Sequence, residues 1–484
     1  MRKYRYLLSF TITFSTILAF QSDGWLSFAT VMYAFGILPL LELVLPADPS
    51  NFSDSEETIL AKDKLFDFFI LAAAASQFVL FGYFLLNIAT VDPSQLTFWG
   101  RSLSFGVHTG VMGINVGHEL GHRVEKWMQR IAMGLLSTSL YAHFFIEHNF
   151  GHHKNVGTPH DPSSARLNEP IYSFWLRAVS QGIISAYNIE KNRLQRKKLP
   201  VFSVHNLFLI LMLVQTALLI GVYAIFGKTV LLAFLLSATT GFLLLETVNY
   251  IEHYGLTRRK VSDRRYEDVN VTHSWNSDHI IGRSVLFELS RHSDHHENPY
   301  RKYQILKHYD QSPQMPTGYP GMMLLTLIPP LWFYVMTEKS INYMEISKEE
   351  LLRKFNERSR TTLMDTLHIQ YTDVGPDYLV AEMPVGPQVH QPYGVLHGGA
   401  TAALAESVGS AASALHIDRN TQQVYGIEIS CNHLRSISEG KVVATAKAIH
   451  LGRSTHLWEI EVRDTEGKLI SHCKLTNMVV SKRN

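Results

Sequence analysis

The chain has 484 residues, a formal net charge of +2 and 46% hydrophobic residues. This length allows two or three domains, and the charge gives no basic footprint for nucleic acid. The two cysteines, Cys431 and Cys473, form no CxxC motif, which excludes a disulfide framework and a cysteine-ligated iron site. A metal bound in the first part of the chain must therefore have nitrogen or oxygen ligands.

Six apolar stretches in the first 250 residues are each expected to cross a membrane, because about 20 such residues span a bilayer. They are residues 6–20, 26–45, 66–89, 96–116, 207–226 and 230–248. A seventh apolar run, 131–146, is expected to be a buried or dipping helix. If it crossed the membrane, it would separate the histidines that precede it from those that follow it.

Basic residues predict the orientation of these helices, since Lys and Arg accumulate in cytoplasmic loops. Segments 123–205 and 257–307 are rich in both, whereas the short loops 21–24 and 90–95 contain neither. We therefore expect six spans, with both termini and both long basic segments in the cytoplasm.

Four histidine-containing clusters lie at the ends of the expected spans or in the basic segments, and thus on one membrane face. They read HELGH (118–122), EHNFGHH (147–153), NYIEHYG (249–255) and RHSDHH (291–296). Together they contain nine histidines: His118, His122, His148, His152, His153, His253, His292, His295 and His296.

Residues four apart share one face of a helix. Three pairs have this spacing: His118 with His122, His148 with His152, and His292 with His296. Neutral imidazole binds iron, zinc, copper and nickel, and nine ligands suit two ions better than one. Neighbouring carboxylates could orient the imidazoles or bind metal directly. These are Glu119, Glu147, Glu252 and Asp294.

Other interpretations explain less of this pattern. HExxH is also a zinc-protease motif, with Glu119 as general base, but it needs only one further ligand and leaves the other clusters unexplained. Histidines outside the clusters are expected to be structural, with His273 as the strongest exception. These are His108, His143, His160, His205, His273, His279 and His308.

Several motifs closely resemble the integral-membrane alkane hydroxylases (alkane 1-monooxygenases). They are GHELGH, FFIEHNFGHHKNVGTPHDPSSAR, NYIEHYGL, HSWNSDHIIGRSVLFELSRHSDHHENPYRKYQIL and TGYPGMMLLTLIPPLWF. The resemblance covers residues 5–338 and implies an all-α membrane domain of six transmembrane helices with a histidine-rich di-iron site. The nine histidines above fall on the family's motifs.

This resemblance implies that O2 is activated at two iron ions and that a terminal methyl of an alkane becomes a primary alcohol. Electrons would come from a separate rubredoxin and its NADH-dependent reductase, at the bacterial inner membrane. Aligning GILPLLE places Ala34 where a bulky aromatic residue would limit chain length. The open alternatives are a fatty-acyl or terpene hydroxylase or desaturase of the same class, and a non-redox metal.

The last 140 residues read as a soluble region. Residues 339–355 are expected to be a linker leading into a helix, which divides the chain into 1–338, 339–355 and 356–484. YLVAEMPV, VYGIEISCNHLRS, KVVATAKAIHLGRSTHLWEIEVRD and KLISHCKLTNMVV alternate apolar and polar residues, as antiparallel strands do. Between them, 394–415 is expected to form one packed helix, which predicts an α+β hotdog fold.

The start of this helix carries Gly398 and Gly399, whose backbone N–H groups favour developing negative charge, and Glu406 lies two turns further on. QPYGVLHGGATAALAESVGSAAS, GIEISCNHLRS and AIHLGRSTHLWEIEVRD resemble hotdog acyl-CoA thioesterases, in particular those acting on 1,4-dihydroxy-2-naphthoyl-CoA and 4-hydroxybenzoyl-CoA.

That resemblance implies Glu406 as general base or nucleophile and the Gly398 N–H as the group polarising the thioester carbonyl. Gln391 and His397 would position the reactants, and Ser410 would line the site. Four residues would contact CoA: His433, Arg435, His450 and Arg453. Such sites form between protomers, so a homo-oligomer is expected. The alternative is a non-catalytic dimerisation or acyl-CoA-sensing module.

Overall fold

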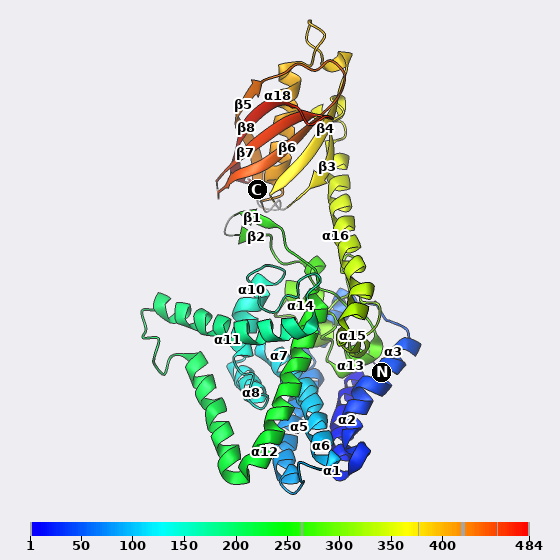
Figure 1. The fold of residues 1–484 in the computed structure, drawn as a ribbon, viewed down its shortest axis with the longest axis vertical. Coiled ribbons are helices and arrows are strands. Elements are labelled where there is room, and N and C mark those ends of the chain that lie inside the picture. The colour runs from blue at the N-terminus through cyan, green and yellow to red at the C-terminus, as the bar shows by residue number, and fades with distance from the viewer. Residues whose placement is uncertain (1, 263–264, 376, 418–421, 453, 483–484) are drawn as a thin grey trace. The chain divides into compact units, whose positions relative to one another are not determined.

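The computed structural model describes residues 2–262, 265–375, 377–417, 422–452 and 454–482. The chain divides into two compact units, a helical unit and a sheet-containing unit (Figure 1). The helical unit comprises Met1–Thr257 and Val269–Ser340. The second unit comprises Arg258–Asp268 and Ile341–Asn484.

The helical unit contains short and long α-helices connected by turns. They are α1 (Phe10–Gln21), α2 (Ala29–Met32), α3 (Leu38–Val44), α4 (Asp54–Lys62), α5 (Lys64–Ile88), α6 (Leu96–His108), α7 (Val116–Gly121), α8 (Lys126–Ser137), α9 (Phe144–Glu147), α10 (His153–Asn155), α11 (Ile171–Arg196), α12 (Leu207–His253), α13 (Ile280–Val285), α14 (His292–Glu297) and α15 (Tyr319–Thr326). The helix α16 (Pro329–Ser359) begins in this unit and continues into the second unit from Ile341. Short 3-10 segments include η1 (Arg2–Ser9) and η7 (Tyr303–Ile305).

Within the described ranges, three helical segments are long and apolar enough to cross a membrane: Gly24–Val44, Lys64–Ile88 and Leu207–His253. Apolar side chains such as Val79 and Ile225 point out of the unit, with 68% and 75% of their surface exposed. Outward-facing apolar surface on long apolar helices is typical of membrane proteins. The helical unit therefore has the surface of a membrane domain.

The expected fifth and sixth spans both lie within α12, which reverses direction at Gly227 (Figure 1). Gly227 has φ 79°, a left-handed conformation that glycine adopts without steric cost. The expected first and fourth spans are helical but interrupted: η1 precedes α1, and a widened turn separates α6 from α7. The run 131–146 is not one helix, since α8 ends at Ser137 before α9 begins.

Three π-helical segments interrupt the α-helices in the described part of the helical unit. They are η3 (Tyr33–Ile37), η4 (Thr109–Asn115) and η5 (His148–His152). A π-turn contains one residue more than an α-turn, and such turns are frequent at functional sites. The segments therefore change which side chains face inward.

The second unit contains a six-stranded antiparallel sheet, with the order β3-β4-β6-β7-β8-β5. Its strands are β3 (Gln370–Val374), β4 (Tyr378–Val385), β5 (Gln422–His433), β6 (Gly440–Leu451), β7 (Thr455–Asp464) and β8 (Leu469–Ser481). The unit also contains α17 (Leu363–Thr366) and a small hairpin of β1 (Lys260–Ser262) and β2 (Arg265–Tyr266). The expected antiparallel strands are thus confirmed.

The helix α18 (Gly398–Ala414) packs on the sheet and supplies the centre of this unit's core. Leu404 and Val408 are fully buried against a layer that includes Trp458, whose indole N–H donates a 2.6 Å hydrogen bond to Ser413 Oγ. Residues 339–355, expected to be a linker leading into a helix, lie within α16, which is continuous from Pro329 to Ser359.

Candidate functional sites

The nine histidines of the four sequence clusters come together in two groups of buried or half-buried imidazoles. The ligand atoms within each group lie within 4.8 Å of one another. The first group is His118, His122, His148, His153 and His295. The second group is His152, His253, His292 and His296.

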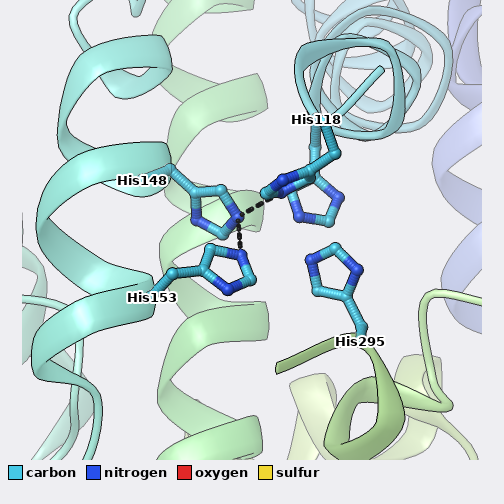
Figure 2. Close-up of side chains that lie close together, drawn as sticks. His118, His148, His153 and His295 are labelled. Carbon is cyan, nitrogen blue, oxygen red and sulfur yellow. Dashed lines mark hydrogen bonds between the residues drawn. The ribbon is translucent and has the colours of Figure 1, made fainter. Parts of the chain in front are cut away.

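Four chain segments that are far apart in the sequence supply the histidines of the two groups. Helix α7 supplies His118 and is followed by His122, both of the first group, and the end of α12 supplies His253 to the second group. The segment η5–α10 and the helix α14 each supply both groups. In Figure 2 the rings of His118, His148, His153 and His295 face a common space between these elements.

The pairing of His148 differs from the expected one. An i, i+4 spacing predicted that it shares a face with His152, but His148 Nε2 lies 3.0 Å from His153 Nε2, and His152 belongs to the second group. The reason is the π-turn η5, whose wider winding brings residues five apart onto one side. The expected pairs His118–His122 and His292–His296 each lie within one group.

Nitrogen atoms of several imidazoles converge to hydrogen-bond distance within each group. His148 Nε2 lies 3.1 Å from His122 Nε2, and His152 Nε2 lies 3.2 Å from His296 Nε2. Buried polar atoms are normally paired. Yet His118 Nε2 and His295 Nε2 have no hydrogen-bond partner among the described residues. Converging lone pairs of this kind fit a bound cation, and imidazole nitrogen fits a transition metal.

Acidic and backbone oxygens hold the second group from outside. Asp161 Oδ2 lies 2.9 Å from His152 Nδ1 and forms a hydrogen bond with it. Glu252 Oε2 lies 3.2 Å from His292 Nε2, but these two atoms form no hydrogen bond with each other. The carbonyl oxygen of His273 lies 3.3 Å from His253 Nδ1, so His273 contributes through its backbone to this contact. Partners of this kind fix the tautomer and orientation of a metal-binding imidazole.

Two of the four acidic residues singled out from the sequence form ion pairs with arginine side chains. Glu119 pairs with Arg123 at 2.9 Å, and Asp294 pairs with Arg301 at 2.9 Å. Glu147 accepts a 3.4 Å hydrogen bond from Ser185. Sequence reasoning missed Asp161, although it lies in the motif GTPHDPSSAR, nine residues after His152. Only its place in that motif could have indicated it.

An apolar cavity of about 70 Å³ leads toward the imidazoles. Ala34 and Val111, in the π-segments η3 and η4, are among its lining residues. A smaller cavity, lined by His118, His148 and His292 among others, shares lining residues with it. The shared residues are Asn115, Leu245, Val248 and Leu289. The two cavities are therefore adjacent, and the smaller one is lined by histidines of both groups.

In the sheet unit, the predicted residues gather around the start of α18. His397 caps the helix, with its Nδ1 accepting a 2.8 Å hydrogen bond from the Gly399 N–H. Glu406 is exposed, and its Oε1 lies 2.7 Å from where a Cβ on Gly426 would be. A side chain at Gly426 would therefore collide with the carboxylate. Ser410 lies on the same helix, one turn beyond Glu406, and its Oγ is 3.4 Å from Asn477 Oδ1.

The residues expected to contact CoA have different surroundings and do not all lie beside the start of α18. The ring of His433 lies beside Gly398 and its Nδ1 is 2.9 Å from Ser471 Oγ, whereas Arg435 donates a 2.7 Å hydrogen bond to the carbonyl of Leu469. His450 is exposed. Arg453 lies outside the described residues. Gln391 is half-buried and precedes the helix, with its N–H bonded to the Val395 carbonyl.

Two family models match the chain: "Fatty acid desaturase" over residues 94–325 and "Thioesterase superfamily" over residues 393–471. The chain is 40% identical over 368 residues to alkane 1-monooxygenase 1 of Pseudomonas aeruginosa, covering 74% of this chain and 96% of that protein. It is 43% identical over 129 residues to a P. aeruginosa protein named as a candidate esterase, and the match covers 27% of this chain and 89% of that protein. The crystal structure of a mutant thioesterase from P. aeruginosa has 41% sequence identity to this chain and a TM-score of 0.27. The match covers 27% of this chain and 94% of that one.

The apolar helices, the clustered imidazoles and the second unit define a histidine-rich membrane enzyme joined to a thioesterase domain. The chain belongs to the alkane 1-monooxygenase family, and its carboxy-terminal region belongs to the thioesterase superfamily. Both resemblances drawn from the sequence motifs are thereby confirmed.

Proposed function

We propose that the helical unit is a di-iron monooxygenase that hydroxylates the terminal methyl of medium- and long-chain alkanes to primary alcohols. The observation that carries this proposal is the meeting of an apolar cavity with two groups of buried imidazoles. Bound iron would supply the activation of O2. Purified protein, supplied with rubredoxin, its reductase, NADH and alkanes, should yield primary alcohols, and their absence would contradict the proposal.

The chain's own residues would hold the ions and aim the substrate. Five imidazoles would hold one ion and four would hold the other. Asp161 would hold the ring of His152 in the required tautomer. The apolar lining, with residues such as Val248, would exclude water and orient the alkane chain.

The redox partner and the topology belong to the same proposal. Electrons would come from a separate rubredoxin and its NADH-dependent reductase. Six membrane-spanning segments would place both termini and both active sites on the cytoplasmic side of the bacterial inner membrane. The basic segments 123–205 and 257–307 support this orientation. Omitting rubredoxin should abolish NADH-driven turnover, and protease accessibility in sealed vesicles should report the side on which each segment lies.

A second candidate is hydroxylation or desaturation of fatty-acyl or terpene chains. The match to the fatty acid desaturase model over residues 94–325 favours a hydrophobic chain substrate in general. Parallel assays with alkanes, fatty acids and terpenes, followed by mass spectrometry of the products, separate the candidates. Turnover of fatty acids in preference to every alkane would reverse the assignment.

The second unit would hydrolyse acyl-CoA through a hotdog-type site. Glu406 would act as general base or nucleophile, and the Gly398 N–H would polarise the thioester carbonyl. Gln391 and His397 would position the reactants, with Ser410 lining the site. His433, Arg435, His450 and Arg453 would contact CoA. The placing of Glu406 on α18, two turns beyond the His397 cap, supports these roles.

A second copy of the chain would complete this site. The strand β5 forms one edge of the sheet and carries exposed apolar side chains, with Tyr425 and Ile427 each 54% exposed. An edge strand of 12 residues with such side chains invites pairing with another chain. Antiparallel pairing of two β5 strands would bury these residues and bring two copies of α18 to one interface.

The interface can be tested in the full chain. Ile427→Lys should convert the homo-oligomer to a monomer in light scattering and reduce acyl-CoA hydrolysis. The matched control is Leu363→Lys, at a leucine of similar exposure (58%) on α17. An unchanged oligomer in Ile427→Lys would exclude this edge. If the wild-type oligomer hydrolyses no acyl-CoA, the alternative of a dimerisation or acyl-CoA-sensing module is favoured.

A further inference from the structure

Two cysteines that lie 42 residues apart in the chain (473 − 431) face each other across two neighbouring strands of the second unit. Cys431 is on the edge strand β5 and Cys473 is on β8, the strand beside it. They are direct partners in the antiparallel register, and both thiols are free. The fold therefore brings together two cysteines that no sequence motif pairs.

The backbone hydrogen bonds of these strands identify the kind of cross-strand pair that the cysteines form. Just beyond the end of β5, the Leu434 N–H donates to the carbonyl of Ile470, its opposite residue, at 2.8 Å. Hydrogen-bonded and non-hydrogen-bonded pairs alternate along an antiparallel ladder. Cys431 lies three positions before Leu434, so Cys431 and Cys473 form a non-hydrogen-bonded pair.

The hydrogen bonds on the other side of β8 lead to the same assignment. The Val479 N–H donates to the Ser454 carbonyl at 2.8 Å, beside β7. Alternate residues of a strand direct their backbone groups to the same neighbour, and Cys473 lies six positions before Val479, so its backbone groups are directed to β7. In a non-hydrogen-bonded pair the Cα atoms are about 4.5 Å apart and the side chains are closest, a separation that a disulfide can span.

Both cysteine side chains lie on the face of the sheet that α18 covers. Cys473 is fully buried in the core of this unit, and Cys431 packs against that core while remaining half-buried. Two residues further along β5, on the same face, His433 lies beside Gly398 and its Nδ1 is 2.9 Å from Ser471 Oγ on β8. Opposed side chains on this face of the two strands are thus within contact distance.

The two thiols differ in exposure and acidity. Hydrogen bonding with the Cys473 thiol lowers the pKa of the Cys431 thiol, whereas the same contact and burial raise the pKa of Cys473. The thiolate is the reactive form of cysteine, and reactive cysteines are partly exposed. Cys431 would therefore react first with a small oxidant, and Cys473 would be the second thiol that completes a link.

We propose that Cys431 and Cys473 form a reversible cross-strand disulfide when the protein is exposed to hydrogen peroxide. The Cys431 thiolate attacks one oxygen of the peroxide, which breaks the O–O bond, forms a sulfenic acid and releases hydroxide, which becomes water by taking up the proton that the Cys431 thiol lost. The sulfur of Cys473 then displaces the sulfenic hydroxyl, which leaves as water with the Cys473 proton, and the S–S bond forms.

The two thiols thereby lose two electrons, and the peroxide is reduced to two waters. Cellular thiols such as glutathione would reverse the link, as is usual for disulfides in reducing compartments. While it lasts, the disulfide would hold the edge strand β5 to β8. The site depends neither on the proposed hydroxylation nor on the proposed hydrolysis.

The test uses the full-length protein in nanodiscs, treated with a small excess of hydrogen peroxide, alkylated with N-ethylmaleimide and digested for mass spectrometry. The peptides that carry Cys431 and Cys473 should be linked within one chain, with neither thiol alkylated, and dithiothreitol should restore both thiols. The link should also raise the unfolding temperature of the second unit by roughly 5 °C or more, because it closes a long loop.

The matched control is the double variant Ser430→Cys/Cys431→Ser, which keeps two cysteines but moves one of them to the opposite face of β5. This variant should form no intrachain disulfide and gain no stability from peroxide. Four results would overturn the site: both wild-type thiols remaining open to alkylation after peroxide; oxidation to sulfinic acid without a link; a link through Cys431 between two chains; or an equal yield of intrachain disulfide in the double variant.

Discussion

His148 and His153 lie five residues apart in the chain, and their Nε2 atoms meet at 3.0 Å. Between them, His152 points to the other group of imidazoles, where its Nε2 lies 3.2 Å from His296 Nε2. One π-turn thus divides three nearby histidines between two candidate metal positions. The same division occurs in α14, where His295 belongs to the first group and His296 to the second.

This division predicts that single substitutions remove one ion each. His295→Ala should lower the iron content from two ions per chain toward one by weakening the first group, and His296→Ala should do the same through the second. Hydroxylation should fall at least about 100-fold in both, which exceeds the usual loss from an outer partner of a ligand. Elemental analysis and alcohol formation measure the two effects. His205→Ala, at an exposed histidine outside both groups, is the control.

Asp161 should matter although it is not one of the nine histidines. Asp161→Asn keeps the size of the side chain but weakens its hold on His152 Nδ1, so activity should fall about 10–100-fold. Iron content should fall less than in His296→Ala. The variant Asp310→Asn, at an exposed acid that contacts His308, provides a matched control. Wild-type turnover in Asp161→Asn would show that this contact does not tune the site.

Ala34 lines the apolar cavity, so its size should affect the length of alkane accepted. Ala34→Trp should reduce turnover of alkanes longer than dodecane and preserve turnover of octane, since only a longer chain extends past the new indole. Product profiles over a series of alkanes measure this effect. Leu40→Trp, at a 64% exposed residue of α3, is the control. Equal loss for every chain length would indicate that Ala34 only packs against a neighbouring helix.

Glu406 should be required for hydrolysis and dispensable for folding, because it is exposed on α18. Glu406→Gln in the full chain should reduce acyl-CoA hydrolysis by about 10²–10⁴-fold, as is common when an acid–base group is removed. Thiol release from acyl-CoA measures the rate, and hydroxylation of alkanes in the same preparation reports an intact protein. Glu439→Gln, at an exposed glutamate away from the helix, should hydrolyse normally.

Two histidines of the second unit make its stability depend on pH. Burial lowers the pKa of His416 and of His456, in each case to about 4. In the unfolded chain an imidazole has a pKa of about 6.5. Below that value the unfolded state binds more protons than the folded state, so the free energy of unfolding decreases as the pH falls from about 6.5 to about 4.

His456→Gln should therefore lose less stability than the wild type between pH 7.5 and pH 5. The unfolding temperature of the second unit in the full chain measures this difference. His472→Gln, at a half-buried histidine that pairs with Glu459, is the control and should follow the wild type. An equal decrease in wild type and His456→Gln would mean that burial of His456 does not produce the effect.

The sequence by itself determined the two families, the antiparallel strands, the helix α18 and the set of nine histidines. These features depend on residue type and short-range spacing. The strand YLVAEMPV alternates because one face of a sheet is buried, and the resulting β4 covers those same eight residues. The clustering of imidazoles near apolar runs likewise needed no coordinates to be recognised.

Only the tertiary structure decided which histidines share a group, that Asp161 meets His152, and that the cavity lined by Ala34 adjoins the one lined by His118. A spacing of four residues predicts a shared face only where the winding is α-helical. The π-turn at η5 breaks that rule, and tertiary packing rather than local spacing selects it. Arg5 and Gln304 line one cavity although they are far apart in the sequence, and such a neighbourhood exists only once the chain has folded.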